Sequence, residues 1–435
     1  MNEFSGDKAE IILAERRYKA ITDILESTVN KTDENAWTYT DLFDHVFLHK
    51  FLGIPIFLAL FWATFQFTFV LSEPFMVIIE MIFGWLGSLA EAGIGNPHLA
   101  SFVSGGIIDG LGSVLVFVPP IFTLFLALSI LEDSGYLARA AFVMDRIMYK
   151  LGLHGRSFIP LMMGFGCTVP AIMATRSMDN ESDRLITILV NPLITCGARL
   201  PVYVLIAGVV FGAGQAGTAI FSLYIMSIAL TIIMAFTFRK TLLKGKPSPF
   251  ILELPAYMVP TAKTVVLHMW ERGKVFLKRA GTIIFGTVII IWFLSMHPWA
   301  ATAGGELVGN SYIASLGHYI EPLFAPFGWD WMAAVALVFG FLAKEVVVAT
   351  YGILLGVGEE AVGASLIKLG LFTPLTGYAF MAFVMIYVPC IATIGIISKE
   401  TNSYKWPIFV TVYLTALAFL IAGLIIGVGR LLGFS

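Results

Sequence analysis

The cysteines are the residues of this chain with the most specific chemistry, and there are three of them: Cys167, Cys196 and Cys390. A thiolate suits transition metals rather than Mg²⁺ or Ca²⁺. Cys167 and Cys390 lie in two apolar stretches, 164–176 and 387–395, in which a Val-Pro pair recurs 219 residues later. Backbone carbonyls freed where a helix is interrupted can complete a coordination shell. The pattern therefore indicates a transition-metal site made by Cys167 and Cys390.

Several neighbours are expected to shape this site. Carbonyls near Gly166 and Pro389 are the expected helpers of the two thiolates. The residues predicted to form the interruptions are Gly164, Gly166, Pro170, Pro389 and Thr393. Carboxylates in apolar surroundings usually face a cavity or a partner charge, so the second-tier metal candidates are Glu132, Asp133 and Glu345.

These assignments compete with plainer ones. A lone cysteine is often a small buried hydrophobic residue, but the matching prolines beside Cys167 and Cys390 favour a ligand role. Cys196 follows an Asn-Pro pair, and its Gly-Ala-Arg neighbours favour close helix packing, so it is assigned to packing. For Glu345, an ion pair with Lys344 is as good an interpretation as a place beside a cavity.

The elements that carry the cysteines are predicted to be broken helices. Glycine and proline interrupt helix propagation. Lipid offers no water to the freed backbone groups, so such a break survives only inside protein or beside a polar cavity. A second internal match supports a duplication, because Leu-Ile-Ala-Gly occurs at 205–208 and again at 420–423. Paired broken segments in two halves of a chain are typical of a transport site.

Composition indicates an all-α polytopic membrane protein. Of 435 residues, 58% are hydrophobic and only 13% are charged, against about 25% charged in soluble domains. A net charge of −2 provides no basic surface for nucleic acid. Three cysteines, an odd number, do not form a disulfide framework.

Enzymatic chemistry is disfavoured. The seven histidines avoid both broken stretches, and neither a His-Glu-x-x-His motif nor a phosphate-binding loop occurs in the sequence. We therefore predict that the chain is not an enzyme and that it neither binds nor hydrolyses GTP by itself.

Hydropathy and charge predict the organisation. Residues 1–50 are expected to form a cytoplasmic amphipathic helix or linker, and 51–435 a transmembrane domain with gate repeats at about 101–215 and 331–435. The first span is predicted at 51–71, and 75–90 is predicted to be interfacial or packed. Lys and Arg cluster at 15–19, 139–184 and 239–279, so these segments are predicted to be cytoplasmic and 297–330 extracytoplasmic.

Longer motifs then resemble a known family. The segments in question are Gly-Phe-Gly-Cys-Thr-Val-Pro-Ala-Ile-Met-Ala-Thr-Arg (164–176), Leu-Glu-Asp-Ser-Gly-Tyr (131–136), Asp-Arg-Leu (183–185), Cys-Gly-Ala-Arg-Leu-Pro-Val-Tyr (196–203), Ala-Lys-Glu (343–345) and Tyr-Val-Pro-Cys-Ile-Ala-Thr (387–393). They closely resemble the membrane domain of the ferrous iron transport protein B (FeoB) family. This resemblance implies gate repeats similar to those of concentrative nucleoside transporters.

The resemblance also implies a function and partners. It implies a multi-pass importer of Fe²⁺ in the cytoplasmic (inner) membrane of a prokaryote, with Fe²⁺ as substrate and no permanently bound cofactor. The implied partners are the lipid bilayer, a GTP-binding domain that is separate or removed, and a small cytoplasmic accessory protein; a homo-oligomer stays open. The alternatives are a gate-type transporter of an organic solute such as a nucleoside, and a membrane anchor for a GTPase.

Overall fold

The structure is a computed structural model. It describes residues 16–17, 19–22, 24, 28, 39–49, 52–96, 99–100, 102–116, 118–150, 153–178, 180–243, 257–277, 282–297, 311–357 and 359–433. The chain divides into two compact units, Met1–His49 and Lys50–Ser435. Helix α2 (Tyr39–Phe47) belongs to the first unit. Among the described residues there is no β-strand, so the predicted all-α fold is confirmed.

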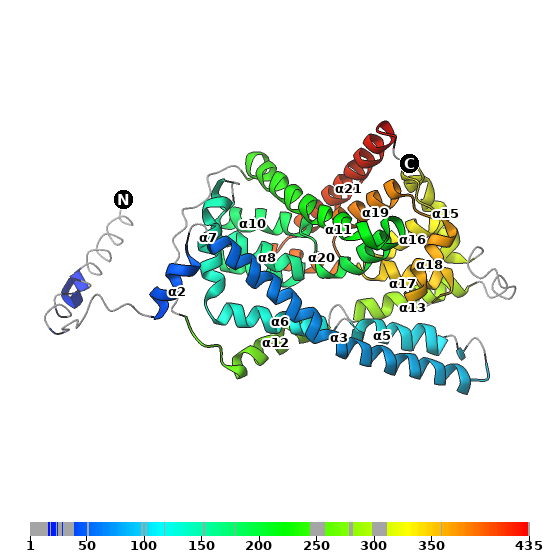
Figure 1. The fold of residues 1–435 in the computed structure, drawn as a ribbon, viewed down its shortest axis with the longest axis horizontal. Coiled ribbons are helices and arrows are strands. Elements are labelled where there is room, and N and C mark those ends of the chain that lie inside the picture. Colours follow the sequence, from blue (N-terminus) through cyan, green and yellow to red (C-terminus); the bar gives the residue numbers. More distant parts are fainter. Residues whose placement is uncertain are drawn as a thin grey trace, which may run out of the picture. The chain divides into compact units, whose positions relative to one another are not determined.

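The second unit consists of helices (Figure 1). Its first half contains α3 (Gly53–Gly93), the π-helix η1 (Phe102–Ile108), α5 (Asp109–Val116), α6 (Val118–Asp133), α7 (Tyr136–Lys150), η2 (Gly155–Ser157), α8 (Phe158–Gly166), α9 (Thr168–Ala174), η3 (Thr175–Ser177), α10 (Glu181–Val190), η4 (Asn191–Leu193), η5 (Gly197–Arg199) and α11 (Leu200–Thr241). Its second half contains α12 (Ala262–Phe276), α13 (Thr282–Met296), α15 (Tyr312–Phe324), η7 (Ala325–Phe327), α16 (Trp331–Phe339), α17 (Val346–Leu355), α18 (Glu359–Leu369), α19 (Pro374–Ile386), α20 (Ile391–Thr401) and α21 (Lys405–Leu431).

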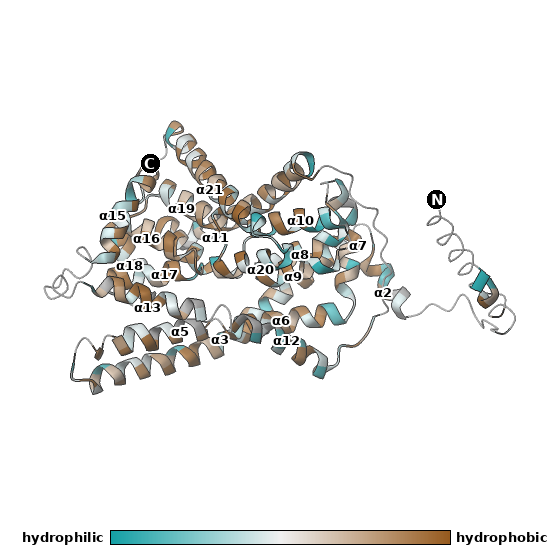
Figure 2. Ribbon diagram, turned by 180° about the vertical axis from the view of Figure 1, so that it is seen from behind, coloured by the Kyte–Doolittle hydropathy of each residue, from teal (hydrophilic) through white to brown (hydrophobic). Residues whose placement is uncertain are grey.

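Long apolar helices make this unit a multi-pass membrane protein. In the described part, five helical stretches are long and apolar enough to cross a bilayer, or up to seven if each of two bent pairs is one span. Helix α11 belongs to two of these stretches, Glu181–Gly212 and Gly214–Thr241, because it is kinked at Gly212. Gly212 adopts φ +66°, a backbone conformation in which a side chain would be strained. Hydrophobic residues run along α3, α13 and α21, whereas hydrophilic ones gather around α7 and the start of α10 (Figure 2).

Helix α3 corrects one expectation. Residues 75–90 are not a separate segment, because they continue the helix of 41 residues that begins at Gly53. They are packed, as one of the two expected alternatives had it, because Phe83 lies against Gly112 of α5. Pro74 lies inside this helix. A proline costs a helix one backbone hydrogen bond, but in lipid the remaining bonds are still best made within the same helix. The buried residues of this helix include three small polar ones, Thr64, Thr68 and Ser72, together with Phe57 and two glycines.

The two broken stretches face each other through their second halves. Helix α8 is followed directly by α9, α19 is followed by α20, and α9 packs against α20. Helix α19 in turn packs against α11 and α21, and α3 packs against α6. In Figure 1, α8 and α20 lie in the middle of this unit.

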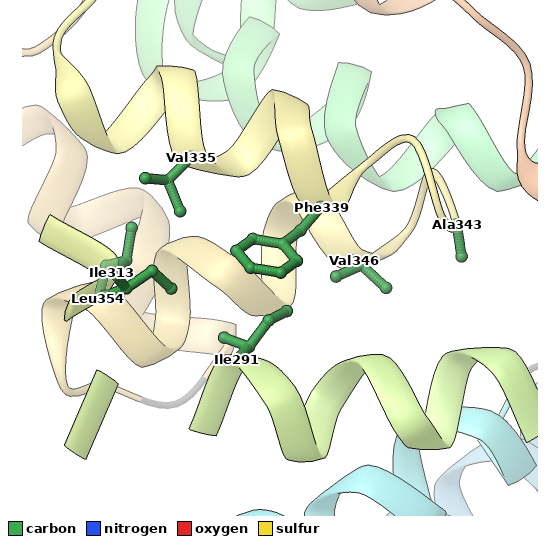
Figure 3. Packing of buried hydrophobic residues seen from close by; sticks show 7 residues of the cluster. All are labelled: Ile291, Ile313, Val335, Phe339, Ala343, Val346 and Leu354. Carbon is green, nitrogen blue, oxygen red and sulfur yellow. The ribbon is translucent and has the colours of Figure 1, made fainter. Parts of the chain in front are cut away.

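A hydrophobic cluster anchors the hairpin formed by α16 and α17 (Figure 3). It is made by Ile291 of α13, Ile313 of α15, Val335 and Phe339 of α16, Ala343 of the turn, and Val346 and Leu354 of α17. Each of these side chains is at most 6% exposed. The backbone on both sides of the turn at 340–345 is therefore held by packing.

Parts of the predicted topology fall outside the described residues. These are most of 5–34, together with 244–256, 278–281 and 298–310. Within the basic segment 239–279, the structure places α12, which packs against α6. Within 297–330 it places α15, whose N-cap Ser311 is buried.

Candidate functional site

Four interruptions of helical structure line one cavity of about 550 Å³ in the second unit. They are the α8–α9 junction, the segment around η5, the turn between α16 and α17, and the α19–α20 junction. Each ends in the N-cap of a helix that leads away from the cavity; these N-caps are Cys167, Arg199, Glu345 and Cys390. Helices α3 and α6 complete the wall through Phe65, Thr68, Phe69, Met76, Pro120, Ile121 and Leu124.

The first break, between α8 and α9, is a single residue. Cys167 has extended backbone angles (φ −151°, ψ 128°), and its N–H donates to the Met163 carbonyl at 3.0 Å. Pro170 lies in the first turn of α9, where an N–H has no partner within the helix, so it is tolerated there. The break therefore falls at the cysteine and not at the proline.

Glycines adjoin this break because neighbours approach closely. A Cβ on Gly166 would lie 2.5 Å from Cδ2 of Leu124, and one on Gly164 would lie 3.0 Å from Oδ1 of Asn191. A glycine at 166 thus lets α8 end against α6, and both Gly166 and Leu124 line the cavity.

The second break comprises Tyr387–Cys390, between α19 and α20. Pro389 has no N–H to donate, and the Cys390 carbonyl accepts from the N–H of Thr393 at 2.9 Å. The Cys390 Sγ also lies 3.2 Å from Oγ1 of Thr393, whose side chain is buried. Cys390, Pro389 and Thr393 all line the cavity.

Cys196 lies on the same cavity wall, which the sequence interpretation missed. It precedes η5, and the guanidinium of the buried Arg199 donates to the carbonyls of Ile194 and Pro192, each at 3.1 Å. The signal for this placement was the Asn-Pro pair at 191–192, which interrupts the chain just as the other breaks do.

Lys344 and Glu345 belong to the turn between α16 and α17, and both line the cavity. Lys344 is only 2% exposed. Its Nζ donates to the Val388 carbonyl at 2.7 Å and lies 3.1 Å from the ring centroid of Tyr387. The lysine thus bonds to the second break. Among the described residues that line the cavity, Glu345 is the one carboxylate.

Glu132 and Asp133 end α6, away from the residues that line the cavity. Asp133 Oδ1 lies 3.7 Å from Nδ1 of His268 in α12. Within the described residues, no group of three or more Cys, His, Asp or Glu side chains is arranged to hold a metal ion. The structure brings Cys167, Cys390 and Glu345 to one cavity but does not close them into a cage.

An ionic cluster joins the end of α20 to η3 and α10. Glu400, near the end of α20, accepts from Nε of Arg176 at 2.9 and 3.0 Å and from the Arg184 guanidinium at 3.0 Å. Arg184 also donates to the Glu400 backbone carbonyl at 2.9 Å. Both arginines lie in the motifs 164–176 and 183–185, and their spacing in the sequence did not predict a shared partner.

Comparison with known proteins adds family information. The family described as "Gate: Nucleoside recognition" matches residues 114–210 and 277–404, and "Ferrous iron transport protein B C terminus" matches 220–272. The Fe(2+) transporter FeoB of Methanocaldococcus jannaschii is 45% identical, over 99% of this chain and 65% of its own length. The Fe(2+) transport protein A/Fe(2+) transporter FeoB fusion protein of Porphyromonas gingivalis is 39% identical, over 97% of this chain and 55% of its own.

A further relative, the Fe(2+) transporter FeoB of Staphylococcus aureus, is 40% identical over 94% of this chain and 62% of its own length. No solved structure matches this chain. The gate match, the helices and the cavity define a polytopic membrane protein of the gate class. With the curated relatives, they show that the chain belongs to the FeoB family. It spans 55–65% of the length of these three relatives.

Proposed function

We propose that this chain imports Fe²⁺ across the cytoplasmic membrane of a prokaryote through the cavity at its four breaks. One observation carries the proposal: residues far apart in sequence, Cys167, Cys196 and Cys390, line the same cavity. Fe²⁺ accepts thiolate ligands, and the curated relatives are named as Fe(2+) transporters.

The two cysteines at the breaks are the proposed ligands. Cys167 and Cys390 stand at equivalent places, each as the N-cap of the second half of a broken helix. Carbonyls of the breaks and water complete the shell. An open arrangement of this kind suits transport, because an ion held by a closed cage of four thiolates would leave too slowly. Cys196 is an additional candidate by its place on the wall.

An organic solute is the second candidate, because the gate family's description mentions nucleosides. A nucleoside would require hydrogen-bonding amide or carboxylate groups around it. Among the described residues that line the cavity, there is no Asn or Gln, Glu345 is the one carboxylate, and hydroxyl groups come from Thr68, Thr168 and Thr393, against three cysteines. The lining therefore favours a metal ion.

Uptake into proteoliposomes tests the proposal. The purified chain should take up radiolabelled Fe²⁺ under anaerobic conditions and should not take up radiolabelled uridine. Protein-free liposomes, and liposomes with the double variant Cys167→Ser/Cys390→Ser, are the controls. Uridine uptake without Fe²⁺ uptake would replace this proposal with the second candidate.

The membrane orientation is part of the proposal. Positive charge predicts that 139–184 is cytoplasmic, and the Glu400 cluster places the end of α20 beside it. A cysteine at Tyr404, which is 83% exposed, should then react with an impermeant maleimide only after permeabilisation, and one at Gly305 in intact cells. Ser311 is unsuitable for labelling because it is buried.

A GTP-binding domain and a small accessory protein are proposed as partners. The curated relatives are longer than this chain, and the P. gingivalis relative is named as a fusion with Fe(2+) transport protein A. A membrane anchor for a GTPase would have no use for a cavity at which four helices begin.

A further inference from the structure

Lys344 is a buried lysine that lines the cavity and bonds to the second break. Its Nζ donates to the Val388 carbonyl at 2.7 Å, and its side chain is 2% exposed. Val388 directly precedes Pro389, and the residue after Pro389 is the cavity-lining Cys390. The carbonyl that the ammonium occupies therefore belongs to the break that supplies one of the proposed thiolates.

The position of this lysine is built by packing. Ala343 and Val346 flank it in sequence and belong to the buried cluster of Figure 3. A Cβ on Gly340 would lie 2.5 Å from the Tyr387 hydroxyl oxygen, so a glycine there lets the end of α16 reach the second break. The ring of Tyr387 then lies 3.1 Å from Nζ and stabilises the ammonium. The backbone is held, and the flexible four-carbon stem is the part that can move.

We propose that Lys344 is a specificity-determining residue: its ammonium is a tethered cation that occupies the Val388 carbonyl until a divalent transition metal displaces it. The inference rests on the proposed function. Only the position of the lysine side chain changes. The cavity wall also carries the Glu345 carboxylate. This carboxylate is the group to which the Lys344 ammonium can bind after it leaves the Val388 carbonyl.

Displacement of this kind selects among metals. A hard cation such as Mg²⁺ prefers oxygen ligands and binds thiolate weakly, so it offers little to offset the repulsion from a nearby ammonium. A metal with affinity for thiolate gains bonds to Cys167 and Cys390 that Mg²⁺ does not. Lys344 thus disfavours entry of the abundant hard ions, and it also promotes release, because the returning ammonium competes for the same carbonyl.

Cobalt binding is the test, because Co²⁺ bound to thiolate gives a charge-transfer absorption band. The purified chain in detergent is titrated with Co²⁺ anaerobically. In Lys344→Met, which lacks both charge and hydrogen bond, Co²⁺ should bind at least tenfold more tightly, with the band unchanged. Lys344→Gln, which can still donate to the carbonyl but has no charge, should also bind more tightly, and it carries the test if the Met variant does not fold. Lys399→Met, at the exposed end of α20, is the matched control and should bind like the parent.

Uptake provides the second readout. Excess Mg²⁺ should inhibit Fe²⁺ uptake by the Met and Gln variants and not by the parent or Lys399→Met. Unchanged or weaker Co²⁺ binding in folded Met and Gln variants would overturn the inference about Lys344. The two proposals fail differently. If the parent shows no thiolate band, the cysteine site is wrong, and the role of Lys344 is then tested by the Mg²⁺ competition. If Mg²⁺ inhibits uptake by neither Lys344→Met nor Lys344→Gln, the inference about Lys344 is overturned.

Discussion

The two breaks carry equivalent cysteines but are held in different ways. At the first break, one extended residue separates α8 from α9, and the Cys167 N–H still bonds to its own helix through the Met163 carbonyl. At the second, Tyr387–Cys390 separate α19 from α20, and the Val388 carbonyl is bound by a lysine from a different hairpin. Both breaks keep a bond to the preceding helix, since the Tyr387 N–H also donates to the Phe383 carbonyl at 2.9 Å. The difference is that the first break packs closely against Leu124, whereas the second also accepts a hydrogen bond from a distant lysine.

The prolines show the same difference. The cysteines are 223 residues apart, whereas the Val-Pro pairs that suggested the repeat are 219 apart. Pro170 lies within α9, three residues after its cysteine, and Pro389 lies in the break, one residue before its cysteine. The two halves are thus equivalent because each cysteine is the N-cap of the helix after its break, and not because of where the prolines lie.

Removing the thiols should give the largest effect. Cys167→Ser and Cys390→Ser should each lower Fe²⁺ uptake at least tenfold at matched protein level, because a serine hydroxyl is a poor ligand for this metal. Cys196→Ser should be milder, because Cys196 caps the short 3-10 helix η5 and not an α-helix of the two breaks. Parent-like uptake by both of the first two variants would refute the thiolate site and leave Glu132, Asp133 and Glu345 as the candidates.

The pH dependence of binding should sharpen the comparison. A metal binds thiolate, so binding releases protons and the affinity falls as the pH is lowered. For each proton released, the affinity should change by up to about tenfold per pH unit. Calorimetric titration with Co²⁺ at pH 6 to 8 should show a smaller slope in Cys167→Ser and in Cys390→Ser than in the parent. Equal slopes in all three would mean that the thiols do not bind the metal.

Substitution of two glycines should test the close packing at the first break. Gly166→Ala should cost about 1–3 kcal/mol of stability, because its Cβ would lie 2.5 Å from Cδ2 of Leu124. Adding Leu124→Ala should recover part of the loss. The matched control is Gly395→Ala in α20, where a Cβ meets nothing within 4 Å and helix propensity favours alanine by about 1 kcal/mol. Thermal unfolding in detergent measures both, and equal effects would contradict the close packing of Gly166 against Leu124.

The ionic cluster between the end of α20 and the segments η3 and α10 should give the smallest effect. Glu400 is 4% exposed, but its partners Arg176 and Arg184 are 51% and 29% exposed, so water screens much of the attraction. Glu400→Gln should therefore cost only about 1 kcal/mol, and less at high salt. Glu321→Gln, at a more exposed pair with His318, is the control and should change the unfolding temperature less. A salt-independent loss would point to packing instead.

The sequence by itself determined the class of this protein and the two cysteines to examine. The apolar composition indicates a membrane protein. Glycine and proline near Cys167 and Cys390 predict helix breaks, because these residues interrupt the backbone hydrogen bonds of a helix. Residue types also sufficed to recognise the family. The continuous helix α3 was missed, since Pro74 is a breaker in water and is tolerated in a long apolar helix.

Only the tertiary structure decided which residues share the cavity. From the sequence, Cys196 was assigned to packing, and Lys344 was considered as an ion-pair partner of Glu345. Sequence spacing predicts contacts along one helix, but it does not predict contacts between distant segments. The bond from Lys344 to Val388 spans 44 residues, and the one from Arg176 to Glu400 spans 224. Such pairs depend on how α9, α20 and the α16–α17 hairpin pack, and that packing is decided by many small contacts rather than by any single motif.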